Sequence, residues 1–285
     1  MPRRLRWLTP YLFLVPGLLW LTIFFVIPMI VMASVSLQEG SLGTGYQLTW
    51  NFGIYPEVVN TYLPQFARSL FYAIIVTIAT LVLGYPIAWT IANRGGRFKN
   101  ILLLLVILPF FTSFIIRTLA WKQILADNGM ILGTLKDWGI LDPGAHVLAS
   151  PLAVISGLTY NFLPFMILPL YVALEKIPPH LGEAATDLYA SRTQAFLRVT
   201  LPLSMPGVFA GSLLVFIPAV GDFINADILG SRDTTMIGNV IQRLFLQTNA
   251  YPEASALGFV LMASVLVLVA IYARVVGADE LTAGG

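Results

Sequence analysis

Six long stretches of the sequence contain no charged residue and are mostly apolar. They cover residues 7–38, 69–93, 100–116, 147–174, 199–221 and 254–273. A helix that crosses a lipid bilayer needs about 20 such residues, and each stretch reaches or approaches that length. We therefore predict an all-α, polytopic membrane protein with six transmembrane helices, at about residues 8–33, 69–92, 101–121, 151–173, 207–228 and 255–275.

The composition supports this class and excludes several others. Hydrophobic residues make up 58% of the chain and charged residues 11%, whereas a soluble domain has roughly 25% charged residues. The net charge of +2 argues against a nucleic-acid partner and leaves membrane lipid as the expected surroundings. The chain has no cysteine and only two histidines, His146 and His180. We predict no metal site, no cofactor and no catalytic residue.

The first apolar stretch has a second interpretation as a cleaved signal peptide. Arg3, Arg4 and Arg6 resemble the basic n-region of a signal peptide, and Ala33-Ser34-Val35-Ser36 contains small residues. However, the apolar run is roughly 25 residues long, against 7–15 in a signal peptide. We favour a helix that is retained.

The placement of Lys and Arg predicts the orientation. Cytoplasmic loops of membrane proteins carry an excess of these residues. With the N-terminus inside, the cytoplasmic side holds Arg3, Arg4, Arg6, Arg94, Arg97, Lys99, Lys176, Arg192, Arg198 and Arg274. The outer side holds Arg68, Lys122, Lys136, Arg232 and Arg243. We expect both termini to be cytoplasmic.

Proline lies inside five of the six predicted helices. The residues are Pro16, Pro28, Pro86, Pro109, Pro164, Pro169 and Pro218. Each removes one helix hydrogen bond and favours a kink, which neighbouring helices tolerate in a membrane bundle. A single kink is explained by packing alone, but five kinked helices favour a transporter with a cavity over a simple anchor.

The segment 175–206 lies between the fourth and fifth predicted helices, on the cytoplasmic side. Pro178 and Pro179 cannot lie in a helix interior, whereas 182–199 is rich in Ala and Leu and predicts a short amphipathic helix. Leu201-Pro202 is expected to end that helix. Its amphipathic pattern fits either a helix in the groove of a partner protein or a helix that lies on the lipid surface.

The residues of this segment carry a resemblance to a known family. Glu183-Ala184-Ala185 is followed by Tyr189, Val199 and Leu201-Pro202 at the spacing of the EAA loop. The chain thus resembles the permease subunits of ABC importers, with the type I permease fold. The resemblance implies that the loop docks on an ATPase subunit through Glu183, Ala184, Ala185, Asp187, Leu188, Tyr189 and Ala190. Tyr189 replaces the family's glycine, which normally allows a sharp bend or a close backbone approach.

The resemblance also implies the partners and the location. No Gly-x-x-x-x-Gly-Lys-Ser/Thr phosphate loop occurs in the chain, so ATP hydrolysis belongs to another polypeptide and the chain is not an enzyme. The expected partners are a cytoplasmic ATPase homodimer, a second homologous permease and an extracytoplasmic solute-binding protein. Residues 1–285 are expected to form one permease domain in the bacterial inner membrane.

Further motifs narrow the solute. The segments 84–89, 109–121, 127–129 and 163–171 resemble the permeases of spermidine/putrescine importers. Importers for thiamine, ferric iron or other small solutes share the scaffold and remain alternatives.

Two acidic residues near the fifth predicted helix suggest a path for a cation. An acid within a membrane is costly and indicates a functional site. Asp222 and Asp227, with Trp121 and Phe223, would suit an organic cation through charge pairing and cation–π contact. The alternatives are an internal ion pair of Asp222 with Arg117 and an exposed loop position for Asp227.

Two other function classes are weaker interpretations of the same residues. An ion-coupled secondary transporter would also use membrane carboxylates, but it has no need of the EAA loop. An intramembrane aspartyl protease would need Gly-x-Gly-Asp, and Ala219 occupies the position of the first glycine before Gly221-Asp222.

Overall fold

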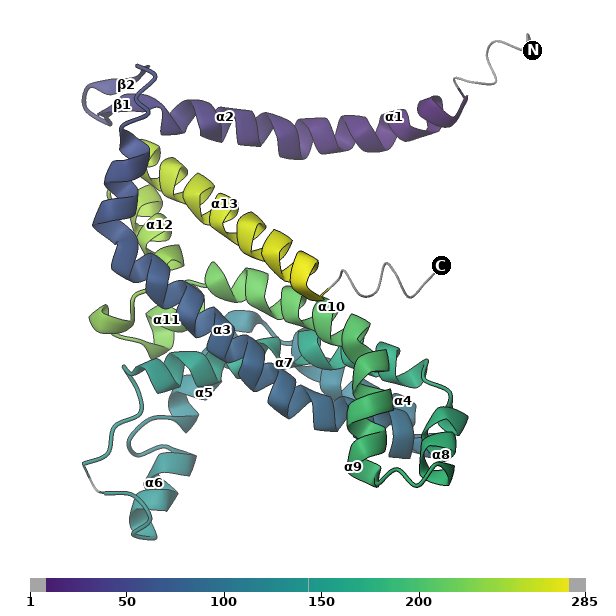
Figure 1. Ribbon diagram of the computed structural model, residues 1–285. Helices are drawn as coiled ribbons and strands as arrows, with labels where there is room; N and C mark the ends of the chain where they lie inside the picture. The colour runs from purple at the N-terminus through teal and green to yellow at the C-terminus, as the bar shows by residue number, and fades with distance from the viewer. Residues whose placement is uncertain (1–8, 143, 277–285) are drawn as a thin grey trace. The chain divides into compact units, whose positions relative to one another are not determined.

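The computed structural model describes residues 9–142 and 144–276. Arg3, Arg4 and Arg6, which contribute to the predicted orientation, lie outside the described residues. Helices make up nearly all of the regular structure, and the one sheet among the described residues has two strands (Figure 1). The described chain separates into two compact units, residues 9–62 with 241–263 and residues 63–240 with 264–276.

The first unit begins with an unbroken apolar helix. It consists of α1 (Thr9–Leu21), a π-helical turn (Thr22–Val26) and α2 (Ile27–Ser36). The antiparallel strands β1 (Gln38–Ser41) and β2 (Gly45–Leu48) follow, with Gln38 opposite Leu48. The Tyr46 hydroxyl donates to the Asn249 carbonyl, and its ring packs edge-on against Tyr251. These contacts attach the strands to the start of α13 (Tyr251–Val276).

The second unit contains most of the helices. α3 (Ile54–Arg94) enters it after a kink at Tyr62. The elements that follow are α4 (Lys99–Ile107), α5 (Phe114–Ile124), α6 (Met130–Asp137), α7 (Pro151–Glu175), α8 (Pro179–Asp187), α9 (Arg192–Ala195), α10 (Leu201–Val220) and α11 (Ile224–Leu229). The helix α12 (Ile237–Leu246) begins in this unit, and its residues from 241 on belong to the first. Short 3₁₀ or π turns lie at Gly96–Phe98, Leu108–Phe111, Phe196–Thr200 and Arg232–Thr234.

The core of this unit lies along α7, which packs closely against α10. Small residues permit the close approach. A Cβ atom at Gly207 would lie 2.5 Å from the Ala173 Cβ and 2.8 Å from the Pro169 carbonyl oxygen. A Cβ at Gly211 would lie 2.7 Å from the Met166 sulfur. Such spacing lets membrane helices gain packing energy where lipid offers no hydrophobic driving force.

The lengths of the helices agree with a protein that crosses the membrane several times. Five helices of the described chain are long and apolar enough: Phe13–Ser36, Ile54–Arg94, Pro151–Glu175, Arg192–Val220 and Tyr251–Arg274. The pair Gly96–Phe111 and Phe114–Ile124 makes a sixth if the two are counted as one bent span. The predicted all-α, polytopic architecture is confirmed.

Two of the predicted spans are not continuous helices. The helix predicted at 101–121 bends by 95° between Phe111 and Phe114, because Thr112 has extended backbone and its hydroxyl donates to the Pro109 carbonyl. The helix predicted at 207–228 ends at Val220, and α11 begins at Ile224. Asp222 therefore lies in a break between helices and not within a long helix.

Candidate functional site

The segment predicted as one amphipathic helix at 182–199 is two helices with a turn between them. α8 begins at Pro179, with Pro178 as its N-cap, and proline at the first helical position costs no hydrogen bond. It ends at Asp187. The next helix begins after Ser191, whose hydroxyl accepts from the Gln194 amide at 3.3 Å while Gln194 Oε1 accepts from the Ser191 amide at 2.9 Å. This capping box fixes the second start.

The turn between the two helices is a Schellman motif with tyrosine at the position that glycine usually occupies. The Ala190 amide donates to the Ala185 carbonyl, and the Tyr189 amide donates to the Thr186 carbonyl, both at 3.0 Å. Tyr189 has φ +61°, in the left-handed region. The sharp bend that the family's glycine allows is therefore present in this chain with tyrosine in its place.

The residues named for ATPase coupling lie together on this motif, which we call the coupling loop (residues 179–191). Leu188 is 82% exposed and Tyr189 is 98% exposed. Glu183, Ala184 and Asp187 are also exposed, and Ala185 and Ala190 are half-buried. Two large apolar side chains thus stand in solvent at the tip of the turn, a position that suits contact with another protein.

The expectation that Leu201-Pro202 ends the helix is wrong. Helical structure runs from Arg192 to Val220, and Pro202 lies in the first turn of α10, directly after the π-helical turn Phe196–Thr200. A π turn shifts the hydrogen-bond pattern, which accommodates the amide that proline lacks. The end of the coupling loop is consequently joined to α10 by continuous helix.

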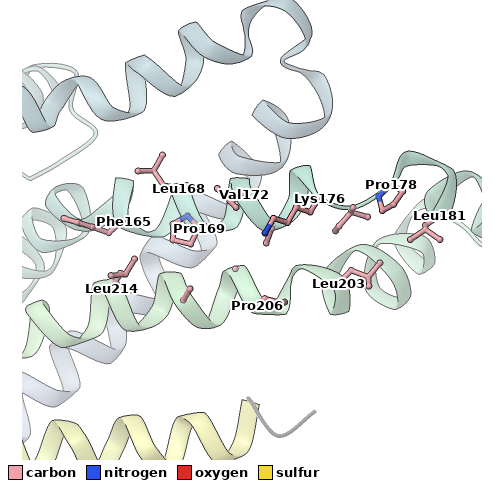
Figure 2. Close-up of a pocket in the computed structure, with 14 residues that line it drawn as sticks. Phe165, Leu168, Pro169, Val172, Lys176, Pro178, Leu181, Leu203, Pro206 and Leu214 are labelled. Atoms are coloured by element: carbon pink, nitrogen blue, oxygen red, sulfur yellow. The ribbon is translucent and has the colours of Figure 1, made fainter. Parts of the chain in front are cut away.

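An apolar groove is lined by residues of α8, in the coupling loop, and by residues of the long helices α7 and α10. The groove lies along α7 and α10 and has a volume of about 620 Å³ (Figure 2). Its walls include Lys176, Ile177, Pro178 and Leu181 beside Leu203 and Pro206. Because α8 supplies part of the wall, a shift of α8 changes the shape of the groove.

A second set of candidate residues surrounds the break between α10 and α11. The Asp222 carboxylate accepts from the Asn225 amide at 2.8 Å and from Asn225 Nδ2 at 3.1 Å. Asn225 Oδ1 in turn accepts from Asn161 Nδ2 at 3.0 Å and from the Thr118 hydroxyl at 3.3 Å. We call these four residues the polar cluster. It ties α5, α7 and α11 together through buried side chains.

Arg117 makes no ion pair with Asp222. The three ion pairs within the described ranges 9–142 and 144–276 are Lys99–Glu175, Lys136–Asp127 and His146–Asp127. The Arg117 guanidinium lies instead 5.4 Å from the ring centre of Phe110 and 5.5 Å from that of Phe114. Those rings supply cation–π contacts that partly offset its burial.

The remaining candidates for the solute path are separate from the hydrogen bonds of the polar cluster. The Trp121 ring stacks on Tyr160 at 5.2 Å, and its Nε1 donates to the Ser156 hydroxyl at 3.2 Å. The side chains of Phe223 and Asp227 are exposed. Sequence reasoning missed Asn161, Asn225 and Thr118, although an amide within a long apolar stretch is the signal that a polar contact is needed there.

Comparison with known families decides the class. Residues 80–278 match the model of the family described as "Binding-protein-dependent transport system inner membrane component". The chain belongs to this family. It is thus a multi-pass inner-membrane permease of a system that works with a solute-binding protein, and not an enzyme.

The permease has curated relatives over most of its length. It is 40% identical over 265 residues to the spermidine/putrescine transport system permease protein PotB of Haemophilus influenzae, covering 90% of each chain. It is 36% identical over 256 residues to the PotB protein of Escherichia coli, covering 90% of this chain and 93% of the other.

Solved structures of similar fold include a chain of a bacterial ABC transporter that imports the acidic polysaccharide alginate. The TM-score is 0.70 at 22% identity, with 95% of each chain covered. A complex of a bacterial alginate ABC transporter with its pentasaccharide-bound periplasmic protein gives a TM-score of 0.72 at 23% identity. These likenesses confirm the permease fold.

Proposed function

We propose that residues 1–285 form one permease domain that carries a polyamine, spermidine or putrescine, across the inner membrane. The observation that carries this proposal is the identity of 36–40%, over about 90% of the chain, to permeases of spermidine/putrescine systems in two bacteria. The permease acts with a second homologous permease and an extracytoplasmic solute-binding protein. Its termini and the coupling loop lie in the cytoplasm.

The coupling loop docks on a cytoplasmic ATPase homodimer. The exposed tip at Leu188 and Tyr189 supports this assignment, because the free energy falls when a partner removes two large apolar side chains from water. The continuous helix from Arg192 to Val220 then transmits movement. A displacement of the loop by the ATPase is carried along this helix toward the polar cluster, where the helix ends.

The solute passes the region of α11. Asp227 and Phe223 are exposed there, and they offer an ammonium group a carboxylate and an aromatic face. Asp222 adds negative charge at the break while its oxygens cap α11. Trp121 and Tyr160 provide a rigid aromatic stack on the neighbouring helices.

Uptake measurements test the proposed solute. The permease is reconstituted with its second permease, its ATPase and its binding protein, and uptake of labelled spermidine is followed. We expect ATP-dependent uptake that excess putrescine inhibits and that thiamine and ferric iron leave unchanged. Uptake that thiamine or ferric iron inhibits, or that polyamines fail to inhibit, would assign the permease to another solute. Uptake driven by an ion gradient without the ATPase would remove the importer mechanism itself.

A further inference from the structure

A second apolar groove lies between α3 and α4. Its volume is about 450 Å³, and it is lined by Pro86, Ile87, Thr90, Ile91, Leu102, Leu105 and Val106. The Thr90 hydroxyl donates to the Pro86 carbonyl of its own helix at 2.8 Å. The groove therefore presents a surface of hydrocarbon with no side-chain charge along its walls.

A tight turn closes this helix pair at one end and brings two arginines there. The Gly95 amide donates to the Ile91 carbonyl at 3.3 Å, and a Cβ at Gly95 would lie 2.4 Å from that carbonyl oxygen. Gly96 has φ +46°. The two glycines thus allow Arg94 and Arg97 to flank a turn that longer side chains would open.

Both arginines are exposed. No carboxylate in the described parts of the chain lies within 4.0 Å of either guanidinium, whereas the neighbouring Lys99 is paired with Glu175 at 2.7 Å. The guanidinium of Arg94 lies 5.2 Å from the Trp89 ring centre, and that of Arg97 lies 4.8 Å from the Phe98 ring centre. Basic and aromatic side chains together mark the level of lipid headgroups.

We propose that this groove binds an anionic phospholipid. Arg94 follows Ile91 by three residues, about 4.5 Å along the helix axis, so the cations lie just beyond the apolar groove. A phospholipid whose acyl chain lies in the groove places its headgroup phosphate at Arg94 and Arg97. The order of hydrocarbon and then positive charge along α3 matches the order of chain and headgroup in one leaflet. This site is independent of the transported solute.

Lipid binding to the assembled transporter tests the proposal. Native mass spectrometry compares phosphatidylglycerol with phosphatidylcholine of identical acyl chains. We expect Arg94→Gln with Arg97→Gln to weaken phosphatidylglycerol binding by about 25-fold, since each basic residue near an anionic lipid contributes about fivefold. Leu105→Trp, which fills the groove, weakens the binding of both lipids. Arg232→Gln, at an exposed arginine on a different segment, leaves both unchanged and serves as the matched control.

Three results would overturn the proposal. The first is that the double variant keeps the preference for phosphatidylglycerol. The second is that inorganic phosphate alone displaces the lipid, which would identify a phosphate site without an acyl chain. The third is a cross-link from Leu105→Cys to the second permease with no lipid retained, which would assign the groove to that subunit.

Discussion

The coupling loop and the polar cluster both form where one helix ends and another begins, yet their polar groups have opposite surroundings. In the coupling loop the Ser191 and Thr186 hydroxyls bond only to nearby backbone, and the large side chains at the tip stand in solvent. In the polar cluster, side chains from three helices bond to one another and are buried. The first region leaves its side chains free for another molecule, and the second uses them to hold its own helices.

This contrast has energetic consequences. A buried polar group that loses its partner costs about 1–3 kcal/mol, and a charged one costs more. An exposed side chain that is truncated costs the isolated permease little, since water replaces its contacts. Mutations in the polar cluster should therefore act on stability, whereas mutations in the coupling loop should act on association.

The largest effect on stability is expected for Asn225→Ala. The change removes the side-chain oxygen that accepts from Asn161 and Thr118. It also removes the Nδ2 group that donates to the Asp222 carboxylate. We expect a loss of about 3 kcal/mol, seen as a lower unfolding temperature and a lower yield of folded permease. Thr186→Ala in the coupling loop is the control, and an equal loss in that variant would end the distinction between the two regions.

Next in size is the loss of ATPase association in Glu183→Lys and Ala185→Trp. The first reverses a charge on α8 and the second adds bulk to a half-buried position. Each should weaken co-purification of the ATPase roughly tenfold or more, with the unfolding temperature unchanged. Normal co-purification together with normal transport would remove the coupling loop from the mechanism.

A smaller effect is expected for Asp222→Asn, which keeps an oxygen to cap α11 and removes the charge. Polyamine uptake should fall about fivefold while the complex still assembles. Asp222→Ala removes the cap as well and should cost about 1 kcal/mol of stability. Normal uptake by the assembled Asn variant would show that the charge of Asp222 has no part in the path.

The smallest effect is expected for Tyr189→Gly. Glycine adopts φ +61° without strain, so the Schellman turn is retained, and the free energy of unfolding should change by less than about 1 kcal/mol. Transport should be retained, and ATPase association should weaken only modestly, because the apolar surface of the ring is lost while Leu188 and the turn still contact the partner. Complete loss of ATPase binding would mean that the tyrosine ring itself is required in the partner's surface.

The number and approximate positions of the spans were predictable, because the apolar stretches long enough to cross a bilayer can be read directly from the sequence. The breaks at Thr112 and at Gly221–Phe223 were not, since they arise from backbone and side-chain hydrogen bonds that hydropathy does not record. The coupling loop was located by spacing, but its division into two helices depends on the cap at Ser191 and on the left-handed Tyr189. Asn161, Asn225 and Thr118 acquire their role only when three helices meet.

Site-directed labelling of Ser191→Cys tests whether the coupling loop faces the cytoplasm and is covered by the ATPase, because the chain has no cysteine of its own that would react. An impermeant thiol reagent is applied to each side of the membrane, with and without the bound ATPase, and Gly144→Cys serves as the control for the opposite side. We expect position 191 to react only from the cytoplasmic side and to become protected when the ATPase binds, while position 144 reacts only from outside. Labelling of position 191 from outside, or equal labelling with and without the ATPase, would contradict this expectation.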